Sequence, residues 1–159
     1  MFPDHAQAAA VILSETMRMK ELVDGILTIS RLDSHDTRLR TEVISLGEFI
    51  EEQIDILQGL GIAEKVSIGM EKEQEDIRVS ADPSLLGKAF QNVVNNCARY
   101  AQSSVTVSLK REGEWAAVCV KDDGPGLDEK EIPHLFERFY KGNKGNFGIG
   151  LSITRAAME

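Results

Sequence analysis

The hydrophobic positions in the first part of the chain follow a helical period. Ile12, Met19 and Ile26 recur every seven residues, and Leu22 and Ile29 fall at intermediate positions. Three further apolar side chains widen this stripe: Val11, Val23 and Leu27. A stripe of this width is typical of a helix that packs against more than one other helix. Because about thirty helical residues span about 45 Å, which is longer than a small domain needs, we expect a bundle or dimer helix over residues 1–34.

After the polar segment 34–40, the pattern changes to short apolar runs and amphipathic helices. Strands are predicted at residues 41–46, 66–70, 77–80, 105–109 and 115–120. Helices are predicted at residues 46–59, 84–101, 129–139 and 149–158, the first two with Ser45 and Asp82 as N-caps. This order predicts an α/β (α+β) fold, a two-layer sandwich of a mixed β-sheet with helices on one face, preceded by the long helix.

Composition limits the partners and the compartment. The chain has 159 residues, of which 42% are apolar, enough for one core and an appended helix. Its net charge is −8 and its basic residues are dispersed, which argues against a nucleic-acid partner. No apolar run approaches the roughly 20 residues of a membrane span. Cys97 and Cys119 fall in a predicted buried helix and a predicted buried strand, which favours free thiols in the cytoplasm over a disulfide or a metal site.

Candidate chemistry begins where the strand at residues 115–120 leads into the sequence Asp122-Asp123-Gly124-Pro125-Gly126-Leu127. A strand that ends in an aspartate followed by two glycines places a fixed carboxylate beside backbone that a flat ligand can approach closely. Asp-Gly and Pro-Gly are also ordinary turn dipeptides. Taken alone, the motif therefore favours a tight surface turn.

Two asparagines upstream and a glycine run downstream change this interpretation. Asn92, Asn96 and Arg99 share one face of the helix at residues 84–101, where an amide among apolar positions needs a partner; a solvated polar stripe is the alternative. The glycine run at residues 145–150 has the spacing of a P-loop, but Leu151 stands where that loop needs its lysine, which excludes a P-loop enzyme. A glycine-rich turn that opens a helix still offers N–H groups to phosphates; a mobile linker is the alternative.

In this order and at these spacings, the three segments resemble the ATP-binding domain of two-component sensor histidine kinases, within the wider family that includes gyrase, heat-shock chaperone and mismatch-repair ATPases. The resemblance covers about residues 8–159, and residues 15–32 resemble the second helix of the kinases' dimerisation and phosphotransfer domain. It implies two cofactors, ATP and Mg²⁺. It also implies that Asn92 and Asn96 are catalytic, that Asn96 is a ligand of Mg²⁺, and that Asp122 accepts a hydrogen bond from the adenine amino group. The residues implied to bind ATP are Asn92, Asn96, Arg99, Tyr100, Asp122, Gly124, Gly126, Leu127, Lys141, Gly148, Ile149, Gly150 and Leu151.

The chain departs from the kinases at both ends. Their phosphoacceptor box, of the form His-Glu-Leu-x-Thr-Pro, is absent, and His5, His35 and His134 lack its context. The chain also ends before the terminal strands that the family would add. We therefore expect residues 1–34 to be the second helix of the dimerisation and phosphotransfer domain without the phosphoacceptor helix. Residues 41–159 are expected to be a C-terminally truncated ATP-binding catalytic domain.

The resulting prediction is the catalytic portion of a bacterial two-component sensor histidine kinase, which donates the γ-phosphoryl group of ATP to a histidine not present in this sequence and is inactive without it. The alternatives are an ATP hydrolase of the gyrase or chaperone type and a non-catalytic dimerising nucleotide-binding module. Asn92 argues against the hydrolase, because the resembling hydrolases carry a water-activating glutamate at this position and an amide cannot take a proton.

The resemblance also implies the partners of the parent protein. These are a second copy of the chain, bound through the N-terminal helix as a homodimer, and the receiver domain of a response regulator in a phosphorelay. No nucleic acid is expected among them. The resemblance leaves open whether the parent protein is a sensor in the inner membrane.

Overall fold

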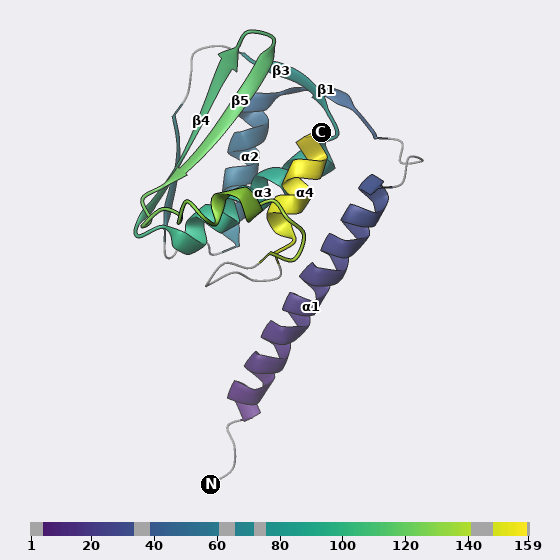
Figure 1. Cartoon of the computed structure of the whole chain (residues 1–159), viewed down its shortest axis with the longest axis vertical. Coiled ribbons are helices and arrows are strands. Elements are labelled where there is room, and N and C mark those ends of the chain that lie inside the picture. Colours follow the sequence, from purple (N-terminus) through teal and green to yellow (C-terminus); the bar gives the residue numbers. More distant parts are fainter. Residues whose placement is uncertain (1–4, 34–38, 61–65, 72–75, 141–147, 159) are drawn as a thin grey trace.

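The structure is a computed structural model that describes residues 5–33, 39–60, 66–71, 76–140 and 148–158. Its elements follow in the chain order α1 (His5–Asp33), β1 (Glu42–Ser45), α2 (Leu46–Gly59), β2 (Ser67–Glu71), β3 (Arg78–Ala81), α3 (Pro83–Tyr100), β4 (Ser104–Glu112), β5 (Trp115–Asp122), the 3-10 turn η2 (Ile132–His134) and α4 (Gly150–Met158). Figure 1 shows α1 as a long rod whose N-terminal half extends away from the globular part.

The strands of the described ranges form two sheets. In the larger one, β4 pairs in parallel with β2 and antiparallel with β5, so the sheet is mixed. In the smaller one, β1 and β3 pair antiparallel. The predicted α/β fold with a mixed sheet is therefore confirmed. The sequence pattern did not reveal that β1 and β3 would pair with each other outside the larger sheet.

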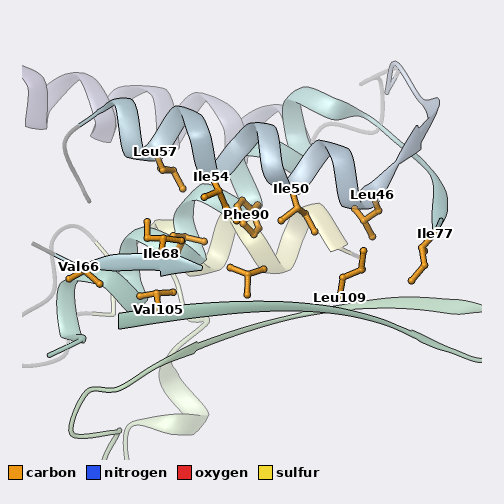
Figure 2. Packing of buried hydrophobic residues seen from close by; sticks show 12 residues of the cluster. Leu46, Ile50, Ile54, Leu57, Val66, Ile68, Ile77, Phe90, Val105 and Leu109 are labelled. Carbon is orange, nitrogen blue, oxygen red and sulfur yellow. The ribbon is translucent and has the colours of Figure 1, made fainter. Parts of the chain in front are cut away.

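A layer of apolar side chains joins α2 and α3 to the larger sheet (Figure 2). Ile50 and Leu57 of α2 are each 1% exposed, and Val94 of α3 and Val107 of β4 are fully buried. These positions recur with period 3.6 in the helices and period 2 in β4, which is why one face of each element is buried. The C-terminal end of α3 consequently lies against the end of β5.

The two predicted N-caps differ. Asp82 caps α3 as expected, because its Oδ1 accepts from the backbone N–H groups of Ser84 (3.0 Å) and Leu85 (3.2 Å). Ser45 precedes α2 but makes no capping hydrogen bond, so this prediction was wrong. Its hydroxyl donates instead to Asp76 Oδ1 at 3.1 Å, because the pairing of β1 with β3 brings Asp76 within reach.

Two further predictions were wrong. The helix expected at residues 129–139 is only the turn η2 within a series of local turns. Its i→i+3 hydrogen bonds, such as His134 N–H to Glu131 O at 3.0 Å, replace those of an α-helix, and Ile132 and Phe139 are exposed rather than packed in a core.

The second wrong prediction is the burial of Cys119. Its side chain is exposed, because it points to the face of β5 opposite the helices. Cys97 is partly buried, and both thiols are free.

No helix in the described ranges has both the length and the apolar character needed to cross a membrane.

Candidate functional site

Helix α3 contacts both glycine segments, at two positions along its length. The first glycine segment (residues 122–127) meets the C-terminal end of α3 at Tyr100, and the second (residues 148–150) meets its middle at Asn92. From Asn92 to Tyr100 the helix rises about 12 Å. The two glycine segments, which are far apart in the sequence, thus both contact the helix that carries Asn92 and Asn96.

Asn92 is bonded directly to the second glycine segment. Its side-chain Nδ2 donates to the carbonyl oxygen of Gly150 at 3.1 Å. Thr154, one turn further along α4, adds a second link, since its hydroxyl donates to Ala89 O of α3 at 3.1 Å. These bonds fix the beginning of α4, with its N-terminal N–H groups, against the polar face of α3.

The second glycine segment also rests on α1. Ile149 and Ile153 form a small core with Ile29 of α1, and each of the three is at most 7% exposed. Gly25 lets the helices approach closely, because a Cβ there would lie 3.2 Å from Ile149 Cγ2. The Ile149 side chain is therefore turned into this small core, so that only its backbone is available to the predicted ATP site.

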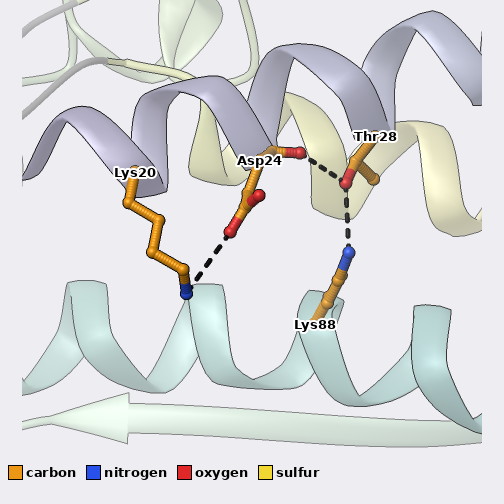
Figure 3. Close-up of polar contacts among 4 residues, drawn as sticks. All are labelled: Lys20, Asp24, Thr28 and Lys88. Carbon is orange, nitrogen blue, oxygen red and sulfur yellow. Dashed lines mark hydrogen bonds and ion pairs between the residues drawn. The ribbon is translucent and has the colours of Figure 1, made fainter. Parts of the chain in front are cut away.

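A polar contact beside the small core ties α1 to α3 (Figure 3). Lys88 Nζ donates to the Thr28 hydroxyl at 3.2 Å, and that hydroxyl donates to the carbonyl oxygen of Asp24 at 2.8 Å. Thr28 is only 8% exposed, so both of its hydrogen-bonding roles are satisfied at the interface. The C-terminal third of α1 is thus packed on the helices that carry the candidate site.

Asp122 lies partly buried at the end of β5, as the strand pattern predicted. Its Oδ1 accepts from the backbone N–H of Gly124 at 2.9 Å, which holds the carboxylate in one orientation. Burial, together with a hydrogen bond to Asp122, raises the pKa of the Cys97 thiol to about 12. The carboxylate is therefore held between the first glycine segment and α3.

Two glycines of the predicted set are required by their surroundings. A Cβ on Gly124 would collide with the carbonyl oxygen of Tyr100, so only glycine lets this segment lie against α3. Gly148 has a φ of +67°, and a Cβ there would collide with the carbonyl oxygen of Tyr140. Both glycines act by allowing close backbone packing.

The other predicted residues fall in three groups. Asn96, Tyr100, Gly150 and Leu151 are partly buried around α3 and α4, while Arg99, Gly126 and Leu127 are exposed. Lys141 lies outside the described residues, as does His35. His5 is exposed on α1, and the His134 ring is paired with Glu137 through Nδ1 and Oε1 at 2.9 Å.

Asn96 offers a neutral amide oxygen as a possible ligand of a cation. Within the described ranges, no group of three or more histidine, cysteine, aspartate or glutamate side chains could hold a metal ion. A neutral amide oxygen suits Mg²⁺ when phosphate oxygens supply the negative charge.

Sequence reasoning missed two residues that organise the site. Asp123 bonds to the turn that follows α3, and Thr154 links α4 to α3. The sequence signals for the Asp123 contact were the two consecutive aspartates and the Ser103-Ser104 pair, but only the fold shows that they meet.

A shallow groove of about 360 Å³, lined by Phe136, Thr154, Arg155 and Met158, contains none of the predicted ATP residues.

Comparisons with known proteins identify the family of the second half of the chain. The family model of histidine kinase-, DNA gyrase B- and HSP90-like ATPases matches residues 81–159. The sensor histidine kinase CssS of Bacillus subtilis is 30% identical over 158 residues, which cover 98% of this chain and 34% of CssS. The chain therefore spans about a third of the length of that relative.

Solved structures of similar fold include two histidine kinases. The structure of AdeS from Acinetobacter baumannii superposes with a TM-score of 0.79 at 18% identity, over 99% of this chain and 75% of that one. The mycobacterial sensor histidine kinase MprB gives a TM-score of 0.63 at 26% identity, over 74% of this chain and 77% of that one. Through residues 81–159 the chain therefore belongs to the family of histidine kinase-, DNA gyrase B- and HSP90-like ATPases, and it carries an ATP-binding catalytic domain of the sensor histidine kinase type.

Proposed function

We propose that this chain is the catalytic portion of a bacterial two-component sensor histidine kinase, which donates the γ-phosphoryl group of ATP to a histidine outside this sequence. The observation that carries the proposal is the bond from Asn92 to Gly150, which unites the asparagine face of α3 with the second glycine segment. A triphosphate beside this face would meet amide groups and helix N–H donors. Such groups bind and orient phosphates without attacking them.

In this proposal each residue has a defined task. The Asp122 carboxylate, an acceptor only, takes a hydrogen bond from the adenine amino group. The Asn96 amide oxygen is a ligand of Mg²⁺, whose charge offsets that of the phosphates. The backbones of residues 148–150 bind the phosphates, with Leu151 beside them, and Arg99 and Tyr100 line the same side of α3. Lys141 is a further phosphate contact.

The hydrolase alternative finds little support in these contacts. An ATP hydrolase of this fold needs a base to activate water, and Asn92 presents an amide whose nitrogen is engaged by Gly150 O. The second alternative is a dimerising module that binds nucleotide without catalysis. It shares the pocket and differs only in whether the bound γ-phosphoryl group can be transferred.

The domain assignment and the partners are part of the same proposal. Residues 1–34 are the second helix of a dimerisation and phosphotransfer domain, and residues 41–159 are the catalytic domain. The apolar stripe of α1 supports a homodimer, because Ile12 and Met19 are 67% and 66% exposed in the single chain. The receiver domain of a response regulator then accepts the phosphoryl group in a phosphorelay, on the cytoplasmic side of a parent sensor.

Calorimetric titration with Mg-ATP tests the binding half of the proposal. We expect Asn96→Asp to weaken binding by at least about tenfold, because an acceptor-only anion would replace a neutral ligand facing phosphates. The matched control is Asn95→Asp, which adds the same charge at an exposed position of α3. If the two variants weaken Mg-ATP binding equally, Asn96 is not a ligand of the metal.

Incubation with γ-labelled ATP tests the catalytic half. The chain alone should show neither acid-labile label nor steady phosphate release, and a helix pair carrying the histidine box, supplied in trans, should become labelled. Phosphate release that depends on Asn92 and Asn96 would favour the hydrolase. Bound ATP with no transfer in trans would favour the non-catalytic module, and label on His5, His35 or His134 would identify an acceptor within the chain.

A further inference from the structure

Asp123 follows Asp122, the residue predicted to bind adenine. Its carboxylate makes an unusually complete set of hydrogen bonds. Its carboxylate accepts from the backbone N–H groups of Gln102 (2.8 Å), Ser103 (3.0 Å) and Ser104 (3.1 Å). It also accepts from the hydroxyls of Ser103 (2.6 Å) and Ser104 (3.2 Å). These five donors among the described residues satisfy both carboxylate oxygens. The set of bonds is referred to below as the Asp123 clasp.

The Asp123 clasp joins segments that are distant in sequence. Residues 102–104 form the turn that leads from the end of α3 into β4, whereas Asp123 directly follows β5. The backbone N–H of Asp123 reinforces the link by donating to Ser104 O at 3.2 Å. The exit of β5 is therefore attached to the exit of α3.

The two chain neighbours of Asp123 are the residues that this attachment controls. On one side, Asp122 lies against Cys97 of α3, and on the other, Gly124 packs on the carbonyl oxygen of Tyr100. A peptide chain leaves little freedom to a residue whose neighbour is fixed at five points. Without the clasp, Gly124 would be held mainly by its hydrogen bond to the Asp122 side chain, and Asp122 by its pairing with Val105 at the very end of β5.

We propose that Asp123 is a positioning residue of the nucleotide site, whose clasp on residues 102–104 sets the place of the Asp122 carboxylate and of the Gly124 backbone. The inference rests on the proposed function, in which Asp122 accepts a hydrogen bond from the adenine amino group. Asp123 itself faces the turn and has no contact with the base in this arrangement. The serine hydroxyl and the backbone N–H groups hold the pKa of Asp123 well below its ordinary range, so the carboxylate stays ionised even in acidic solution.

The test compares Mg-ATP and Mg-GTP binding by calorimetry in the chain and in Asp123→Asn. The amide presents an N–H₂ group to donors, so the clasp is weakened while the side-chain size is kept. We expect the ratio of ATP to GTP affinity to fall by roughly tenfold, which corresponds to weakening about one hydrogen bond to the base. This ratio reports on the site itself, because a smaller folded fraction would lower both affinities equally.

The matched control is Asp76→Asn. Asp76 is likewise an exposed carboxylate that bridges separate segments, since it accepts from Ser45 Oγ (3.1 Å) and Arg78 Nε (2.9 Å). It lies two residues before β3, away from the glycine segments, and its loss should leave the ratio of ATP to GTP affinity unchanged. If Asp123→Asn does not fold, Ser103→Ala and Ser104→Ala remove the two hydroxyl donors alone and should lower the ratio in steps.

The outcomes separate the inference from the function on which it rests. A lower ATP to GTP ratio in the clasp variants, with an unchanged ratio in Asp76→Asn, supports the inference. An unchanged ratio in folded clasp variants overturns it and leaves the proposed function in place. Failure of the original chain to bind Mg-ATP overturns the proposed function, and the inference with it.

Discussion

The two glycine segments of the candidate site are held by different kinds of contact. The first segment is fixed from within the globular part, through the Asp123 clasp and the packing of Gly124 on Tyr100. The second is fixed by hydrogen bonds between α4 and α3, by the packing of Gly148 on Tyr140, and by a small apolar core shared with α1. The Asp123 clasp joins two segments of the globular part, residues 102–104 and 123, whereas the small core depends on where α1 lies. A displacement of α1 should therefore disturb the second segment and leave the first in place.

The largest effect is expected from a substitution in the first glycine segment. Asp122→Asn should cost about 1.5–3 kcal/mol of ATP binding, because a charge-assisted acceptor for the adenine amino group becomes an amide. ATP and ADP should lose the same amount, since the change lies at the base. Calorimetry with both nucleotides, and with GTP, measures this. Asp128→Asn is the control, because that carboxylate accepts a hydrogen bond only from the nearby Lys130 N–H among its described contacts, at 2.9 Å. If Asp122→Asn discriminates between ATP and GTP as well as the original chain does, Asp122 does not bind the base.

The next largest effect loosens the second segment through α1. Ile29→Ala removes a side chain that is 7% exposed. We expect the free energy of unfolding to fall by about 2 kcal/mol. This is the low end of the range for a buried isoleucine, because a small core can close around the missing atoms. Urea unfolding and limited proteolysis of α1 measure the loss. Leu27→Ala on the same helix, where the side chain is 50% exposed, should have little effect. Equal behaviour of the two variants would show that the small core does not hold α1.

A smaller effect concerns the direct link from α3. Asn92→Ala removes one of two side-chain donors to Gly150 O, since the Thr154 hydroxyl also lies 3.2 Å from this oxygen. We expect the free energy of unfolding to fall by about 1 kcal/mol. Hydrogen exchange should show weaker protection in the first turn of α4 and no change in residues 102–104. Asn95→Ala, at an exposed position of the same helix, serves as the control. Loss of protection at both glycine segments would contradict the independence of the two.

The smallest effect is a difference in thiol reactivity. The thiolate is the reactive form, and because burial and Asp122 raise the pKa of Cys97 to about 12, almost none of it is ionised at pH 8. Cys119 is exposed on β5. Iodoacetamide followed by peptide mass spectrometry should therefore modify Cys119 well before Cys97. Early modification of Cys97 would show that the first segment opens more readily than the clasp implies.

Local signals in the sequence carried much of the fold. Asp82 was recognisable as a cap because its side chain acts on the next three residues, and the strands β4 and β5 followed from alternation over a short run. Where a side chain had a partner from elsewhere, the same reasoning failed. Ser45 bonds Asp76 instead of capping α2, and the segment 129–139 has helical spacing but no core to cover its apolar side.

For the site, the sequence by itself determined which residue types are present: the asparagine pair, the aspartate after β5 and the glycines whose missing Cβ atoms permit close packing. These depend on spacing within one element or one turn, so they are legible in order along the chain. Only the tertiary structure decided that Asn92 meets Gly150, that Asp123 clasps the turn after α3, and that Ile149 is turned toward α1. Each of these contacts joins residues from different elements, and their meeting depends on how the helices pack on the sheet, which no local spacing encodes.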